Sequence, residues 1–307
     1  MCGRHEHIRI RACPFLEGCR SMTRPNAIGI GAQKCASSFI HAVLGSHPQA
    51  DVATDKELDF FSYYFDHGYR WYETHFEGMN CDIRFEASPS YFHDPRAPQR
   101  VHDFDPGMRI VCLLRDPVER AFSNHLHELI KGHIPASTSF EDGLANNPSY
   151  TEQGMYADHL HRWFSCFDKD QILVLLAEDV RRDTAAQAAR VYEFLGIEQD
   201  FSTNLLSERR NVSDRARFGW LRATLRAQGQ AMRRMGLEEQ LAALKKVTPF
   251  RQLLKMNSVD VRDEIPPMRA ETRQRLTETF ADQIIETENL SGRDLSLWPS
   301  HPDHGTQ

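Results

Sequence analysis

Short apolar runs alternate with amphipathic segments over the first two thirds of the chain. The clearest run is RIVCLL at 109–114, which has the length and composition of a strand buried on both faces. After the first apolar run, Phe39, Val43 and Leu44 recur at the spacing of one helix face. Because strands and helices alternate, the pattern predicts an α/β fold, with a central parallel sheet flanked by helices. Strands are predicted at 27–31, 83–86, 109–114 and 171–176, and helices at 38–46, 117–131 and 183–195.

Cap residues mark the ends of two predicted helices. Pro117 suits the first turn of the helix that follows the 109–114 strand, and Gly132 suits its end. Asp183 or Thr184 can cap the later helix, which Gly196 would end.

Beyond Ala216 the pattern is almost wholly helical, and it ends with a helix that carries Leu276, Phe280 and Ile284 on one face. Residues 207–256 are rich in Lys and Arg, which is typical of a solvated helix face but can also attract an anionic ligand.

The chain has 307 residues, of which 40% are hydrophobic, and this suits a globular protein. Residues 1–23 lack the apolar region of a secretory signal and are expected to form a disordered arm. The expected organisation is a single domain at 24–300, divided into an α/β core at 24–200 and a mostly helical region at 201–300.

Charge and cysteine usage exclude several classes of protein. The net charge of -6 gives no reason to expect nucleic acid as a partner. No apolar stretch reaches the length of a membrane span. An odd number of cysteines without a Cys-x-x-Cys pair argues against a disulfide scaffold and a zinc site, and indicates a reducing, cytoplasmic location. The seven cysteines are at 2, 13, 19, 35, 81, 112 and 166.

A candidate anion site follows the first predicted strand, where the sequence GAQKCASS at 31–38 leads into a helix. Backbone amides at the opening of a helix bind anions, and Lys34 adds a point charge. A Walker A loop needs Gly-Lys-Ser/Thr to hold magnesium, and here Gln33 precedes the lysine and Cys35 follows it. The alternative is a strand-to-helix turn with a serine N-cap. The candidate phosphate-binding residues are Lys34, Cys35, Ala36, Ser37 and Ser38.

A second candidate anion site follows the 109–114 strand. Arg115 comes directly after that strand, and Ser123 lies in the second turn of the next helix. A guanidinium and a hydroxyl together suit a phosphate monoester. The alternative is a surface arginine that pairs with Asp116 or Glu119. Two anion sites after two strands of one sheet imply one ligand with two separated anionic groups.

Several motifs in a fixed order resemble the sulfotransferases that use 3′-phosphoadenosine 5′-phosphosulfate (PAPS), above all the heparan-sulfate-type group and its bacterial relatives. They are the lysine loop, KELDFF, EASPSYF, LLRDPVERAFSNH and ILVLLAEDV…FLGI, between about 27 and 197, and LSGRDLSLW near the end. The resemblance implies a sulfotransferase fold similar to that of P-loop nucleotide kinases. It implies that residues 24–200 bind PAPS and that residues 201–300 form an acceptor or lid region. PAPS would be released as PAP after transfer, and no metal would be required. The first loop would hold the 5′-phosphosulfate, and Arg115 with Ser123 the 3′-phosphate.

Glu57 in the motif KELDFF is the candidate catalytic base. Leu58, Phe60 and Phe61 flank it, and a carboxylate against apolar walls has a raised proton affinity. The alternative is an exposed Lys56–Glu57 pair at the end of a strand. The resemblance matches Glu57 to the base of the family, and Lys34 can stabilise the charge of the leaving group as a second catalytic residue.

Two further segments supply candidate binding residues. In EASPSYF some relatives carry a lysine where this chain has Ala87. Glu86, Ser88, Tyr91 and the following His93 are expected to contact the acceptor, although a tight turn at Ser88–Pro89 would also explain the motif. In many sulfotransferases a late basic loop closes over the nucleotide. The candidates here are Arg209, Arg210, Arg215 and Arg217, with Arg215 taken as the cofactor-binding residue, and a solvated helix face is the alternative.

The sequence therefore predicts transfer of a sulfuryl group from PAPS to a hydroxyl, with an amine as the second choice, of a carbohydrate, glycolipid or small molecule. The mechanism would be an in-line displacement with a glutamate base. The alternatives are a nucleotide or small-molecule kinase with a degenerate phosphate loop and a non-catalytic binding protein. The acceptor, its sulfation at oxygen or nitrogen, and the oligomeric state are not specified by the sequence.

Overall fold

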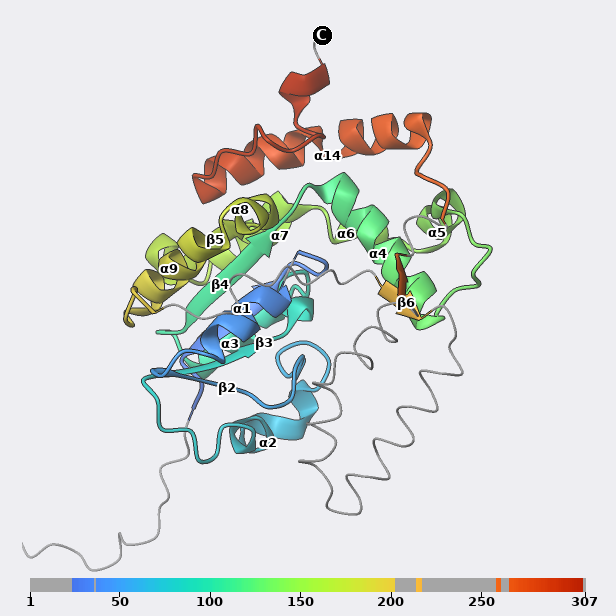
Figure 1. The fold of residues 1–307 in the computed structure, drawn as a ribbon. Helices are drawn as coiled ribbons and strands as arrows, with labels where there is room; N and C mark the ends of the chain where they lie inside the picture. The colour runs from blue at the N-terminus through green and yellow to red at the C-terminus, as the bar shows by residue number, and fades with distance from the viewer. Residues whose placement is uncertain (1–23, 36, 202–213, 217–257, 261–264, 306–307) are drawn as a thin grey trace, which may run out of the picture.

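The computed structural model describes residues 24–35, 37–201, 214–216, 258–260 and 265–305 (Figure 1). The predicted arm at 1–23, the loop residue Ala36 and most of the predicted helical region at 201–264 lie outside the described residues. Of Ser37, Ser38 and Arg215 the structure describes the backbone.

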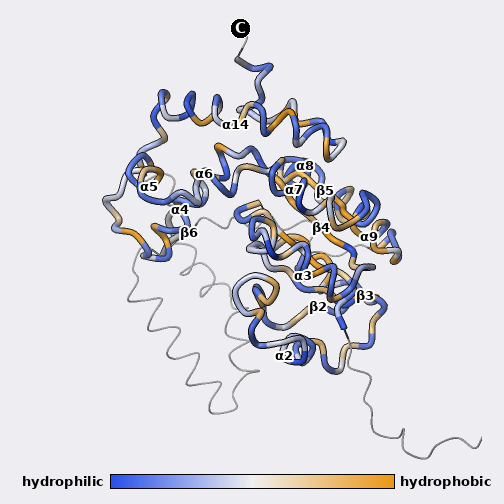
Figure 2. The backbone as a smooth tube through the Cα atoms, turned by 180° about the vertical axis from the view of Figure 1, so that it is seen from behind, coloured by the Kyte–Doolittle hydropathy of each residue, from blue (hydrophilic) through white to orange (hydrophobic). Residues whose placement is uncertain are grey.

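The core of the fold is a five-stranded parallel sheet, as predicted. Its strand order is β2-β3-β1-β4-β5, and its strands are buried because helices cover both faces. Figure 2 shows hydrophobic positions concentrated on β4 and β5 in the middle of the molecule. The strand β2 was not predicted, because its three residues contain no apolar run. The strands are β1 (Ala27–Gly31), β2 (Ala50–Val52), β3 (Ile83–Ala87), β4 (Arg109–Leu114) and β5 (Ile172–Leu176).

The helices form layers on the two faces of the sheet. The crossovers from β1 to β2 and from β3 to β4 run in opposite directions along the sheet, so right-handed connections place α1 and α3 on opposite faces. Helix α9 contacts α1 on one face, whereas α3 and the end of α7 meet on the other, where the His102 and Phe167 rings are 5.5 Å apart. The helices are α1 (Ser37–Leu44), α2 (Gly68–Thr74), α3 (Ala97–Phe104), α4 (Pro117–Lys131), α5 (Phe140–Asn146), α6 (Ser149–Glu152), α7 (Tyr156–Phe164), α8 (Ala177–Arg182) and α9 (Thr184–Leu195).

The predicted ends of the two helices are confirmed, with Pro117 in the first turn of α4. The Asp116 side chain accepts a hydrogen bond from the Glu119 amide at the start of α4, and Gly132 ends that helix in a left-handed conformation. The Asp183 side chain accepts from the Ala186 amide at the start of α9, and Gly196 ends it.

The C-terminal part is less uniform than its helical pattern suggests. The predicted last helix is confirmed as α14 (Ala270–Ser291), which buries Leu276, Phe280 and Ile284. It crosses one end of the molecule and packs on α7 and α4, whereas α2 lies at the other end (Figure 1). A short antiparallel pair, β6 (Asp214–Ala216) and β7 (Ser258–Asp260), differs from the predicted run of helices. Long-range pairing of this kind leaves no local periodicity in the sequence.

Candidate active site

The first candidate loop leaves β1 at the carboxyl end of the sheet. Gly31 has a φ of 110°, and a Cβ atom at this position would lie 2.8 Å from the carbonyl oxygen of Pro89. Only glycine fits there, because the backbone of the neighbouring segment comes too close for a side chain. The chain then turns through Lys34, whose φ of 68° is also left-handed. The loop is therefore shaped by close backbone contact before it enters α1.

The Lys34 ammonium group is half-buried and faces the other candidate residues. Burial lowers its pKa, the Glu57 carboxylate opposes this shift, and Arg115 adds to it. Lys34 is thus within electrostatic range of a residue from each of the other two motifs. Within the part of the chain that the structure describes, no carboxylate forms an ion pair with Lys34. Its charge can therefore meet an anionic ligand.

The second candidate site lies at the end of β4. The Arg115 side chain is buried, and one of its terminal nitrogens lies 3.6 Å from the Glu119 carboxylate. That carboxylate is shared, because its other oxygen accepts a shorter bond of 2.9 Å from Arg273. The Arg115 Nε atom is buried without a hydrogen-bond partner among the described residues. Ser123 is half-buried in α4, as predicted from its position.

A buried tyrosine connects the two candidate loops. The Tyr156 hydroxyl donates a hydrogen bond of 2.9 Å to the Arg115 carbonyl oxygen and lies 3.8 Å from the Cys35 sulfur. Burial raises the pKa of the Cys35 thiol to about 11, so the thiol is neutral and acts as a packing group in the loop. No local sequence signal points to Tyr156, because it is separated by 41 residues from Arg115. Through these two contacts Tyr156 fixes the position of the Lys34 loop relative to the Arg115 loop.

The C-terminal segment closes the same region. The fully buried Asp116 carboxylate accepts hydrogen bonds from the Ser300 amide at 2.8 Å and the Ser300 hydroxyl at 2.6 Å. Trp298 donates to Glu178, and its ring lies 6.0 Å from that of Tyr156. The LSLWPS segment thus supports the Arg115 loop, although 184 residues separate Ser300 from Asp116 in the sequence.

The third motif places Glu57 at the end of β3. The Glu57 amide donates to the Ala87 carbonyl at 3.2 Å, and both Glu57 and Asp59 have left-handed backbones. The Glu57 side chain is exposed and opens into a pocket of about 230 Å³. The expectation that apolar neighbours enclose this carboxylate is wrong. The turn buries Leu58, Phe60 and Phe61 in the core, whereas the Glu57 side chain is exposed to solvent.

Three residues expected to contact the acceptor are instead buried beneath the Glu57 loop. The Glu86 carboxyl is 1% exposed and accepts hydrogen bonds from Tyr72 and Ser88. Burial raises the pKa of Glu86 to about 7, against the effect of its hydrogen bonds. Ser88 accepts from the Asp59 amide, and the Tyr91 hydroxyl accepts from the backbone of the same loop. These side chains position the loop and do not reach the pocket, because hydrogen bonds to the backbone hold them inside.

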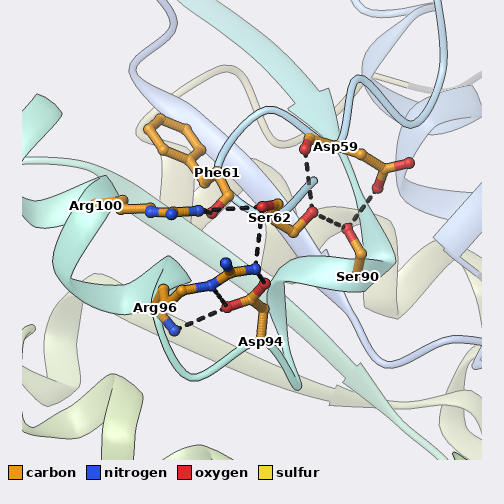
Figure 3. A network of polar contacts seen from close by, with 7 residues as sticks. All are labelled: Asp59, Phe61, Ser62, Ser90, Asp94, Arg96 and Arg100. Carbon is orange, nitrogen blue, oxygen red and sulfur yellow. Dashed lines mark hydrogen bonds and ion pairs between the residues drawn. The ribbon is translucent and has the colours of Figure 1, made fainter. Parts of the chain in front are cut away.

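The same loop is held from its other side by a second network (Figure 3). Ser90 donates to the Asp59 carboxylate and contacts the Ser62 hydroxyl at 2.7 Å. Arg100 donates to the Ser62 carbonyl at 3.1 Å, and Arg96 reaches the same oxygen at 3.4 Å. The loop that carries the candidate base is therefore anchored although its tip is exposed.

His93 is not among the described residues that line the pocket beside Glu57. Burial lowers its pKa, and Arg120 and Arg162 are among its charged neighbours, whereas Glu57 is not. Two residues that the motifs did not indicate, His127 and Lys131 on α4, lie within electrostatic range of Lys34. Within the described ranges, no three His, Cys, Asp or Glu side chains come together as a metal site. None of the described helices is long and apolar enough to cross a bilayer.

Comparison with known proteins agrees with this arrangement. The sulfotransferase domain family matches residues 24–218. Mouse heparan sulfate glucosamine 3-O-sulfotransferase 6 is 30% identical over 204 residues, which are 64% of this chain and 59% of that protein. Human heparan sulfate glucosamine 3-O-sulfotransferase 3B1 is 32% identical over 193 residues, which are 60% of this chain and 49% of that protein. The chain thus spans about half of the length of these relatives.

A solved structure has the same fold. The sulfotransferase from Alicyclobacillus acidocaldarius superimposes with a TM-score of 0.66 at 24% identity, over 90% of this chain and 99% of that chain. The family match covers the sheet, the lysine loop, the Glu57 loop and the arginine site. The chain therefore belongs to the sulfotransferase domain family of enzymes.

Proposed function

We propose that this chain transfers a sulfuryl group from PAPS to a hydroxyl of a carbohydrate, glycolipid or small-molecule acceptor. One observation carries the proposal: Lys34, Arg115 and Glu57 come from three separate segments, and Lys34 is within electrostatic range of both other residues. Lys34 would contact the sulfuryl end of the donor, and Arg115 would contact its 3′-phosphate.

The described residues fit such a donor. The buried Arg115 Nε has no hydrogen-bond partner among the described residues, and an unsatisfied buried donor is costly unless a ligand accepts from it. The side chains of Ser123 and Lys34 likewise have no hydrogen bond or ion pair within the described ranges. The donor carries its own transferable group, so the loop has no need of the magnesium-binding serine of a Walker A motif.

The proposed step is an in-line displacement. Glu57 accepts the proton of the acceptor hydroxyl while the acceptor oxygen forms a bond to sulfur. The bond between sulfur and the bridging oxygen of PAPS breaks, and that oxygen leaves with the electron pair as part of PAP. Lys34 stabilises the negative charge on the leaving oxygen. Because Glu57 is exposed, its proton can pass to water after the acceptor product leaves.

The names of the relatives support a hydroxyl as the accepting group, since they are 3-O-sulfotransferases of a glucosamine unit. A human relative named bifunctional heparan sulfate N-deacetylase/N-sulfotransferase 3 keeps an amine as the second choice. The chain lacks the lysine of some relatives at Ala87. Lys131 lies within electrostatic range of Lys34 and would supply a positive charge in place of the missing lysine.

The test combines PAP binding with sulfuryl transfer. Titration calorimetry should detect PAP binding to the wild type. The double variant Lys34→Ala/Arg115→Ala should not bind PAP. PAPS labelled with ³⁵S should yield labelled product from a panel of glycans, glycolipids and phenols. Absence of PAP binding together with magnesium-dependent consumption of ATP would support the kinase alternative and overturn the proposal. Binding of PAP without transfer to any acceptor would support a non-catalytic role.

A further inference from the structure

A group of aromatic rings lines the pocket beside Glu57. His67, Trp71 and His75 are spaced four residues apart, so they share one face of the helical segment that contains α2. The Trp71 ring lies 4.7 Å from the His67 ring and 4.5 Å from the His75 ring, both in edge-to-face geometry. Tyr64 stacks on His67 at 5.4 Å. These four residues, here called the ring face, form a continuous aromatic wall.

Most of the ring face lies outside the core, and only Trp71 packs against it, 6.1 Å from the Phe60 ring. The opposite side of α2 supplies the packing, where Tyr72 stacks on Phe60 at 4.6 Å with both residues fully buried. On the ring face Tyr64 is 46% exposed and Trp71 is half-buried. An exposed aromatic cluster next to a carboxylate in a pocket is typical of a ligand-binding surface.

The charges around the pocket limit the class of ligand. Its described lining contains the carboxylates of Asp55 and Glu57 and one permanent cation, Lys56. A highly sulfated glycan needs several Lys or Arg side chains to compensate for its charge. Two carboxylates against one ammonium group repel such a ligand and leave an uncharged one unaffected.

We propose that the ring face is an acceptor subsite for an uncharged six-membered ring that carries the hydroxyl to be sulfated. This inference rests on the proposed function, because it takes Glu57 as the base. The flat side of the ring packs on Trp71 and Tyr64, and the hydroxyl points to Glu57. The imidazoles of His67 and His75 donate to or accept from the other ring substituents. An uncharged sugar and a phenol share this chemistry.

Acceptor competition tests the inference. With labelled PAPS, an uncharged hexoside and 4-nitrophenol are compared with a highly sulfated heparan sulfate oligosaccharide. At least one uncharged ring should exceed the sulfated oligosaccharide in kcat/KM by about tenfold or more. The comparison between the hexoside and the phenol shows whether the preferred acceptor ring is that of a sugar or that of a phenol. A preference for the sulfated oligosaccharide would overturn the inference while leaving the proposed function intact.

Variants locate the subsite. Tyr64→Ala and His67→Ala should raise the KM for the uncharged acceptor by about tenfold while leaving the PAP Kd unchanged. Trp71→Ala should have the largest effect, but because Trp71 is half-buried the two exposed positions carry the test. Tyr63→Ala is the matched control, since Tyr63 is 61% exposed and is not part of the pocket lining. Equal KM values for Tyr64→Ala, His67→Ala and Tyr63→Ala would contradict the subsite.

A binding measurement separates the two proposals. In the presence of PAP, calorimetry should detect millimolar or tighter binding of an uncharged ring acceptor, weakened in Tyr64→Ala. If PAP binds but neither uncharged ring binds, the inference is overturned. If PAP itself does not bind, the proposed function fails first.

Discussion

The proposed donor side, around Lys34 and Arg115, and the proposed acceptor side, around Glu57, are built differently. On the donor side the key groups are buried and connected from behind, since Tyr156 bridges Cys35 and Arg115, and Ser300 holds Asp116. On the acceptor side Glu57 is exposed and opens into a shallow pocket. The proposed donor site is therefore held in shape by contacts within the protein, whereas the proposed acceptor site presents an open surface.

This difference suits a reaction with one constant substrate and one that varies. Preorganised charges are most effective when their geometry is fixed before the reaction. On the proposed acceptor side, buried side chains hold the Glu57 loop in place. Ser88 accepts from the Asp59 amide and donates to Glu86, while the Glu57 side chain remains accessible. Variation among acceptors can then occur in the pocket without change to the donor loops.

The variant with the largest expected effect on the difference between the donor side and the acceptor side is Glu57→Gln. We expect turnover to fall by about 10²- to 10⁴-fold, because a general base is lost, while the PAP Kd stays unchanged. Initial rates with labelled PAPS and calorimetry with PAP measure the two sides separately. Glu77→Gln, another exposed glutamate, is the control. Near-normal turnover in Glu57→Gln would remove this residue from the mechanism.

The second test concerns the anchor below the loop. Glu86 has its pKa raised from 4.5 to about 7 by burial, so between these values the unfolded chain has lost the proton that the folded chain keeps. Stability therefore falls as pH rises through this window, and the decrease amounts to about 3 kcal/mol above pH 7. Glu86→Gln should remove this decrease, measured as the free energy of unfolding in urea from pH 4.5 to 8.

The Glu86 effect must be read from the difference between variant and wild type. The buried His159, whose pKa burial lowers to about 4, acts in the opposite direction, because its protonation in the unfolded chain lowers stability as pH falls below 6.5. Subtraction of the two curves cancels this contribution. Parallel curves for wild type and Glu86→Gln would show that Glu86 is ionised in the folded state at neutral pH.

On the donor side Arg115→Ala should weaken PAP binding by about 10- to 100-fold, since a charge-assisted hydrogen bond is worth about 1.5–3 kcal/mol. The KM of the acceptor should not change, which is the reverse of the pattern for Tyr64→Ala. Arg275→Ala, on the exposed side of α14, is the control. An unchanged PAP Kd would separate Arg115 from the donor site.

The smallest expected effect is that of Tyr156→Phe. Loss of one buried hydrogen bond should lower the free energy of unfolding by about 1 kcal/mol and weaken PAP binding by about fivefold. Tyr192→Phe is a matched control, because the Tyr192 hydroxyl is buried without a hydrogen-bond partner in the described part of the chain. Equal PAP affinity in the two variants would show that the bridge does not position the loops.

By itself the sequence determined four of the five strands of the central sheet, the helices α1, α4, α9 and α14, and the identity of the motifs. The apolar run at β4 and the caps Asp116 and Gly132 specify a strand and a helix locally, because hydrophobic spacing and cap chemistry depend on near neighbours. The placement of Lys34 and Arg115 at strand ends followed from the rule that parallel strands present their carboxyl ends at one edge.

Only the tertiary structure decided which motif residues reach the pocket. Glu57 and Glu86 both lie beside apolar residues, yet one is exposed and the other fully buried, because Glu57 and Asp59 have left-handed backbones outside the sheet whereas Glu86 lies within β3. Tyr156, Ser300 and the short strand β2 were likewise hidden, since their roles depend on contacts between segments far apart in sequence. Local spacing specifies which elements form, but burial and long-range hydrogen bonds arise from how those elements pack.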